Sequence, residues 1–139
     1  MRKGMRRFFK NEKGQAVIEL AITLPILLLV LCGIIDFGWI FSNKMLIIYN
    51  SREGARYGSL IATEANAKTL ITNRVIDITP EYLQDEMTVG VTFSNPTDIR
   101  AGDIKVKASC SIKALTPLVG IFIKDQTILL ESTCVMKIE

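Results

Sequence analysis

The feature that most constrains this chain is an apolar tract near its N-terminus. No charged residue occurs from Leu20 to Ile35, and residues 16–18 and 37–41 extend the tract on both sides. Its total length is about that of one membrane-spanning helix, which needs roughly 20 predominantly apolar residues. No second tract of this kind follows in the sequence. The chain is therefore predicted to cross a lipid bilayer once.

Positive charge is concentrated before this tract. Six basic residues and one acidic residue precede Gln15, so this leader carries +5; because the whole chain carries +3, the residues from Gln15 onward carry −2. A basic segment next to the first span marks the cytoplasmic side of the membrane. We therefore expect a single-pass cell-membrane protein with a cytoplasmic N-terminus and with the residues beyond about Asp36 outside. The acidic remainder gives no support to nucleic-acid binding.

Helical spacing of apolar residues continues beyond the membrane tract. Proline is absent from residues 26–79, so one helix of about 45 residues, 15–60, is expected to form both the transmembrane segment and a stalk. Pro25 is expected to kink the membrane half of this helix. A second, shorter amphipathic helix is predicted after Thr63, its candidate N-cap, and Pro80 ends it.

From Met87 onward the apolar residues recur with a period of two. This alternation predicts half-buried strands over residues 87–93, 104–112 and 128–138. A small antiparallel three-stranded sheet packed against the stalk follows, so the predicted fold class is α+β. The expected divisions are a basic leader (1–14), a transmembrane and stalk helix (15–60) and an extracytoplasmic α+β domain (61–139).

The cysteines fit this topology. Cys32 lies in the span and is expected to act as a small apolar residue. Cys110 and Cys134 share the inward phase of their strands on the outer side, where a disulfide is permitted. If Ile112 faces Ser132 in an antiparallel pair, Cys110 falls opposite Cys134 and a disulfide can form. Two buried free thiols are the alternative.

Residues for catalysis or metal binding are not evident. The sequence contains no histidine and no CxxC spacing, so a His-based triad or a zinc site has no candidate side chains. We predict no catalytic residue, no cofactor and no metal, and an enzyme is the least favoured class.

A short motif surrounds the end of the basic leader. The leader is followed by Gly14, Gln15 and an apolar helix whose fifth residue is Glu19. This order resembles the signal of type IV prepilins. An ordinary secretory signal is cut after its apolar run, whereas here the glycine precedes the run, which would be retained.

A longer stretch narrows the resemblance. Residues 14–59, GQAVIELAITLPILLLVLCGIIDFGWIFSNKMLIIYNSREGARYGS, resemble the TadE-like minor pilins, or pseudopilins, of tight-adherence (Tad) pili. That family shows G-Q-A-x-V/I-E, then L-P, then G-I-I-D/E-F-G, then A/S-R-E-G-A-R. The resemblance implies a pilin-like fold and a prepilin peptidase that cuts between Gly14 and Gln15. It also implies that other pilin subunits and the pilus assembly platform are partners, beside the bilayer.

Glu19 needs a reason to lie in an apolar helix, because a carboxylate at bilayer depth costs about 3 kcal/mol. Cleavage after Gly14 would turn the nitrogen of Gln15 into a charged amine close to Glu19. We expect Glu19 of one subunit to pair with the terminal amine of its neighbour during assembly. The alternative is that Glu19 lies near the cytoplasmic headgroups of an uncleaved anchor.

Small residues mark further contact sites on the helix. Gly33 and Gly38 are expected to ease close contact with another helix. In SREGARYGS, the residues Gly54, Ala55 and Gly58 leave one helix face nearly bare. Packing on the protein's own sheet and packing on another subunit both fit this bare face.

Two arginines flank the bare face. Arg52 and Arg56 are candidates for a subunit contact, and Glu53 is a local counter-ion.

Two functional classes follow. The leading hypothesis is a non-enzymatic structural subunit, a TadE-like minor pilin of a Tad (type IVc) pilus or a related secretion apparatus. It would be processed after Gly14 and assembled through its N-terminal helix, reaching the surface pilus. The alternative is an uncleaved single-pass accessory protein whose outer domain scaffolds or binds an assembly partner. Only the first requires a mature N-terminus at Gln15.

Overall fold

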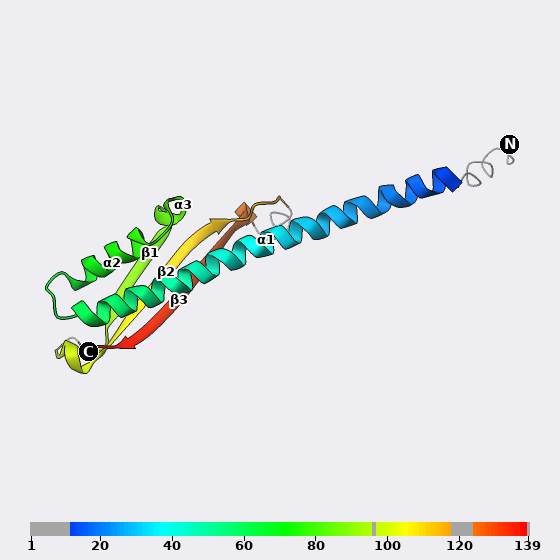
Figure 1. Ribbon diagram of the computed structural model, residues 1–139. Coiled ribbons are helices and arrows are strands. Elements are labelled where there is room, and N and C mark those ends of the chain that lie inside the picture. Colours follow the sequence, from blue (N-terminus) through cyan, green and yellow to red (C-terminus); the bar gives the residue numbers. More distant parts are fainter. Residues whose placement is uncertain (1–11, 96, 118–123, 139) are drawn as a thin grey trace.

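One long helix dominates the architecture (Figure 1). The computed structural model describes residues 12–95, 97–117 and 124–138. Helix α1, Glu12–Ile61, has 50 residues and runs through Pro25 without a break. Its N-terminal half extends away from the rest of the protein, and its C-terminal half lies along a sheet (Figure 1). Length and composition make α1 able to cross a membrane.

The other elements form a small layer against the C-terminal half of α1. After α1 come the helices α2, Ala67–Asp77, and α3, Glu81–Gln84, and then the strands β1, Met87–Phe93, β2, Asp103–Lys113, and β3, Thr127–Lys137. The strands form one antiparallel sheet in the order β1-β2-β3. Short 3-10 turns at Ile99–Ala101 and Lys124–Gln126 precede β2 and β3. The predicted α+β fold is therefore confirmed.

The start of the second helix differs from the prediction. Thr63 is not the N-cap; α2 begins at Ala67, after Asn66. The segment between α1 and α2 is occupied by turns, in which Glu64 N donates to Ile61 O and Ala67 N donates to Glu64 O. The chain reverses direction here (Figure 1), and these turns use the residues that the sequence pattern had assigned to the helix start.

The predicted pairing of the two strand cysteines is wrong. Cys110 lies opposite Leu130, and Cys134 lies opposite Val106, so the register is shifted by four residues from the one expected. Four residues correspond to about 13 Å along a strand, beyond the Cα separation of about 7 Å that a disulfide spans. Both cysteines are free thiols. A shift by an even number keeps every side chain on its face, so alternation alone could not fix the register.

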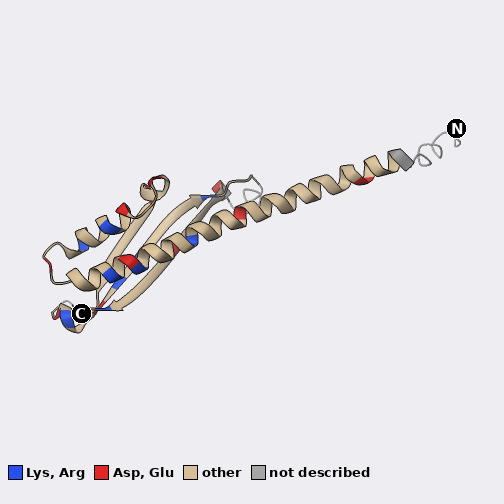
Figure 2. Ribbon diagram, in the orientation of Figure 1, with Lys and Arg blue, Asp and Glu red and all other residues tan. Residues whose placement is uncertain are grey.

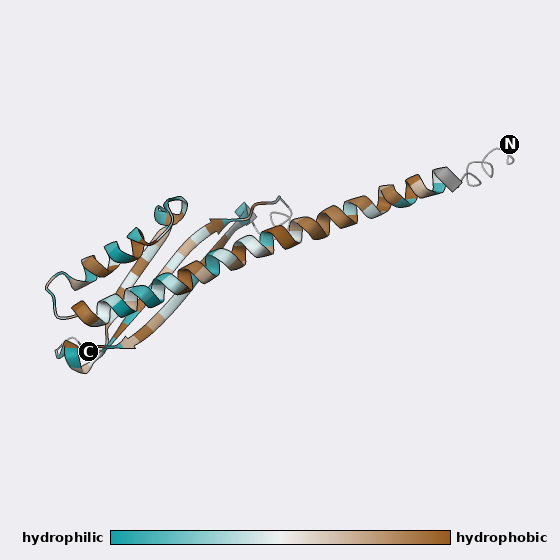
Figure 3. Ribbon diagram, in the orientation of Figure 1, coloured by the Kyte–Doolittle hydropathy of each residue, from teal (hydrophilic) through white to brown (hydrophobic). Residues whose placement is uncertain are grey.

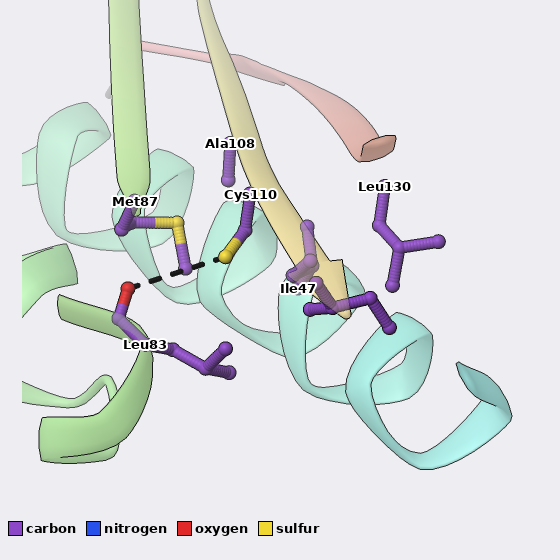
Figure 4. Packing of buried hydrophobic residues seen from close by; sticks show 7 residues of the cluster. Ile47, Leu83, Met87, Ala108, Cys110 and Leu130 are labelled. Carbon is purple, nitrogen blue, oxygen red and sulfur yellow. Dashed lines mark hydrogen bonds between the residues drawn. The ribbon is translucent and has the colours of Figure 1, made fainter. Parts of the chain in front are cut away.

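The core is built from the inward side chains of β2. Ile104, Val106, Ala108, Cys110 and Ile112 are all buried, as the alternation predicted. The cluster nearer the membrane segment joins Cys110 to residues of α1, α3, β1 and β3, and Figure 4 shows Ile47, Leu83, Met87 and Leu130 around it. Burial raises the pKa of the Cys110 thiol, and the charge of Glu86 adds to this, which keeps the thiol protonated.

A second core cluster lies farther from the N-terminal half of α1. It depends on the close approach of α1 to α2 and β2. A Cβ at Gly54 would lie 2.6 Å from Cγ2 of Val75, and one at Gly58 would overlap Cδ1 of Ile104. Ala55 between them is fully buried. The bare face of α1 therefore packs within the chain, which is one of the two alternatives that the sequence left open.

A pair of glycine substitutions tests this packing. Gly58→Ala should destabilise the protein by about 1–3 kcal/mol because the new methyl group overlaps the core. Gly38→Ala is the matched control, since nothing lies within 4 Å of its Cβ position and alanine is the better helix former. Thermal unfolding of the full chain in detergent should show a lower midpoint for Gly58→Ala only. Equal midpoints would contradict the packing.

Candidate assembly surface

The N-terminal half of α1 exposes apolar side chains on all sides. From Val17 to Phe37 the large apolar residues are 46–70 % exposed, and Figure 3 shows this half of the helix as predominantly hydrophobic. Leucine, which dominates this segment, is a strong helix former. An apolar helix without a polar face requires an apolar environment on every side, such as lipid or other helices.

Glu19 is an exception on this surface. Its side chain is exposed, four residues after the exposed Gln15 and five after Gly14. Four residues of helix correspond to about 6 Å along the axis. Within the part of the chain that the structure describes, Glu19 forms no ion pair. Only its main-chain carbonyl has a side-chain partner, the hydroxyl of Thr23 at 2.7 Å.

Asp36 has a structural role that its position at the end of the charge-free tract did not reveal. Its side chain is 3 % exposed, although it directly follows the charge-free tract. Oδ1 accepts hydrogen bonds from the backbone nitrogens of Leu115 and Thr116 at 3.0 and 2.9 Å. Oδ2 accepts a hydrogen bond from Oγ1 of Thr116. Asp36 therefore fixes the segment after β2 to α1 at the end of the membrane tract. The sequence did contain a signal for this role: a carboxylate directly after the charge-free tract, with no basic residue close to it in the sequence.

Removing this carboxylate should release the segment after β2. In Asp36→Ala the backbone amides of Leu115 and Thr116 lose their acceptor, so their hydrogen exchange should accelerate by at least about tenfold. Asp77→Ala, which removes an exposed carboxylate, is the control and should leave these amides unchanged. Exchange of the full chain in detergent, followed by mass spectrometry, measures both. Equal protection in Asp36→Ala and wild type would refute the anchoring role.

The small residues of α1 divide into two groups. Gly33 and Gly38 have nothing within 4 Å of their Cβ positions, so their surroundings are open to another helix or to lipid. Gly54, Ala55 and Gly58 are buried against α2 and β2. Only the first group remains available for contacts outside the chain.

The two arginines of the stalk also differ. Nε and Nη2 of Arg56 both donate to Glu53 at 3.0 Å, and Nη2 of Arg74 donates to it at 3.4 Å. Hydrogen bonds from Arg56 and then from Arg74 hold the pKa of Glu53 below its ordinary 4.5, against the opposing effect of burial. Their contribution to stability is thus present at neutral pH and is lost as the pH falls below 4.5 through the lowered value. Arg52 is exposed and has no ion pair among the described residues.

Comparison with known families agrees with the resemblance seen in the sequence. Residues 14–56 match the family model described as TadE-like protein. The matched segment runs from the glycine before the apolar half of α1 to Arg56 in the stalk. No curated protein and no solved structure gave a significant match.

Proposed function

We propose that this chain, which carries a TadE-like segment at residues 14–56, is a non-enzymatic minor pilin of a Tad (type IVc) pilus or a related secretion apparatus. The observation that carries the proposal is the exposed apolar half of α1 with Glu19 one turn after Gly14 and Gln15. A helix of this kind can exchange lipid neighbours for the helices of other subunits without changing its own fold.

Processing at Gly14 gives Glu19 its role. A prepilin peptidase on the cytoplasmic side would cut the peptide bond between Gly14 and Gln15 and leave a charged amine on Gln15. The amine of one subunit and the Glu19 carboxylate of the next would then neutralise each other where either charge alone is costly. The positive end of the helix favours the carboxylate further. Before assembly, the basic leader holds the N-terminus in the cytoplasm and the domain outside.

The cleavage site can be tested directly. Gly14→Leu should block the peptidase, because a bulky side chain replaces the hydrogen at the cleaved bond, and a longer precursor should accumulate in the membrane. Gly4→Leu places the same change elsewhere in the leader and should still be processed. Intact mass of protein from native membranes distinguishes the two. A wild-type chain that keeps residues 1–14 would support the uncleaved accessory protein instead.

Glu19 should matter for assembly and not for processing. Glu19→Ala makes the span more apolar, so insertion and cleavage after Gly14 should be normal, but the subunit should be missing from sheared surface filaments or fail to support them. Glu19→Asp keeps the charge and should be less harmful. Immunoblots of membranes and sheared filaments at native expression levels provide the measurement. Normal assembly of Glu19→Ala would favour the headgroup-anchor alternative.

A further inference from the structure

The solvent-exposed face of the stalk is unusually apolar for a helix outside the membrane. Phe37 and Phe41 stack with ring centroids 6.2 Å apart, and Met45 and Tyr49 follow with 51 % and 60 % exposure. Arg52 lies seven residues after Met45, on the same side of the helix. We call Met45, Tyr49 and Arg52 the stalk face; it continues the exposed apolar surface of the membrane half.

A complementary surface lies at the corner formed by α3. A cleft of about 560 Å³ is bordered by Trp39, Tyr82, Leu83 and Glu86, among others. The rings of Trp39 and Tyr82 lie 5.7 Å apart, so the cleft offers aromatic surface to an apolar or aromatic side chain.

Two charged residues line this cleft, Glu86 and Lys113, and three further carboxylates lie on α3, directly after it or at the end of α2. Asp77, Glu81, Asp85 and Glu86 are all exposed, and none forms an ion pair within the described ranges. The sequence contains no lysine or arginine from residue 75 to 99. Figure 2 shows these acidic residues gathered at α3 and the end of α2. We call the aromatic cleft and the carboxylates of Glu81, Asp85 and Glu86 the α3 corner; carboxylates outnumber Lys113 there, so the corner matches an apolar side chain followed by a cation.

We propose that the stalk face binds the α3 corner of a second copy of this chain. Tyr49 would enter the aromatic cleft while Arg52 pairs with Glu86, which lines the cleft, or with Asp85 directly before it. The two surfaces are different, so the contact is heterologous and generates an open, helical array instead of a closed dimer. This inference rests on the proposed function, because it describes how minor pilin subunits contact one another outside the membrane.

The direction of the required shift agrees with the proposed contact in the membrane. The cleft lies at the level of Trp39, ten residues before Tyr49, so the second copy must be displaced outward by roughly 15 Å. Pairing of Glu19 with the Gln15 amine of a neighbour also displaces that neighbour outward, by about 6 Å. Both contacts displace the neighbouring copy outward. Two different neighbours on the same side of one helical array must be displaced in the same direction.

Charge exchange between the two surfaces tests the contact. Two differently tagged copies are expressed in native membranes, extracted in mild detergent and co-purified. Arg52→Glu in both copies should lower co-purification about tenfold, and so should Asp85→Lys with Glu86→Lys. All three changes in every copy should restore most of the yield, because the charges are complementary again. Arg100→Glu, an exposed arginine elsewhere on the domain, makes the same change in charge and should not affect the yield.

A crosslink locates the contact independently of yield. Arg52→Lys keeps the positive charge and supplies an amine, which a zero-length carbodiimide should join to Asp85 or Glu86 of the copy with the other tag. Peptide mapping by mass spectrometry identifies the linked residues. The proposal is overturned if wild-type copies do not associate, if Arg52→Glu associates normally, or if the triple change does not recover.

The same samples separate this inference from the proposed function. If Glu19→Ala abolishes the filaments while Arg52→Glu associates normally, the stalk contact is refuted and the minor pilin role stands. If the chain is not cleaved but its copies still crosslink through position 52, the minor pilin role is refuted and the stalk contact stands.

Discussion

The position of α1 on the domain depends on three buried polar side chains spaced seven residues apart. Asp36 binds the segment after β2, Asn43 accepts a hydrogen bond from the Tyr82 hydroxyl at 3.1 Å, and Asn50 donates to Oγ1 of Thr79 at 2.8 Å. Seven residues return nearly to the same helix face. Oδ1 of Asn50 remains without a partner in the described structure, which offsets part of the stability that these hydrogen bonds contribute. These hydrogen bonds also fix the position of α1, because sliding the helix by one turn would separate all three side chains from their partners.

This row divides α1 into two environments. Before Asp36 the helix is largely exposed and, apart from Gln15, Glu19 and Thr23, apolar from residue 15 to 35; after Asp36 one face is buried against the sheet. The division occurs without a change in secondary structure, since α1 is helical from residue 12 to 61, including Pro25, which has no backbone donor. One helix thus connects the exposed apolar segment to the domain, and the segment anchored by Asp36 lies where the two environments meet.

The sequence predicted the elements better than their mutual placement. Alternation in Ile104 to Ile112 identified the strand and its buried face, since side chains on a strand alternate strictly. It could not set the pairing of Cys110, because every even shift preserves the same pattern. The spacing of Glu53 and Arg56 was enough to predict their ion pair. Arg74 approaches Glu53, and α3 approaches α1, only because the chain reverses direction after α1. Asp36 was missed as an anchor because its partners are about 80 residues away.

Rigidity of α1 makes contacts at its two ends interdependent. Glu19 and Arg52 are separated by 33 residues of one helix, or about 50 Å, and Pro25 is the only proline between them. A subunit that moves outward by a given distance at the level of Glu19 moves the stalk face by nearly the same distance. The contacts proposed at both levels, each with a different neighbour, would therefore have to fit one helical array, whereas the contact at Glu19 alone would permit the domains to slide. The buried row of Asp36, Asn43 and Asn50 extends this constraint to the α3 corner, because it prevents the domain from shifting along the helix that carries it.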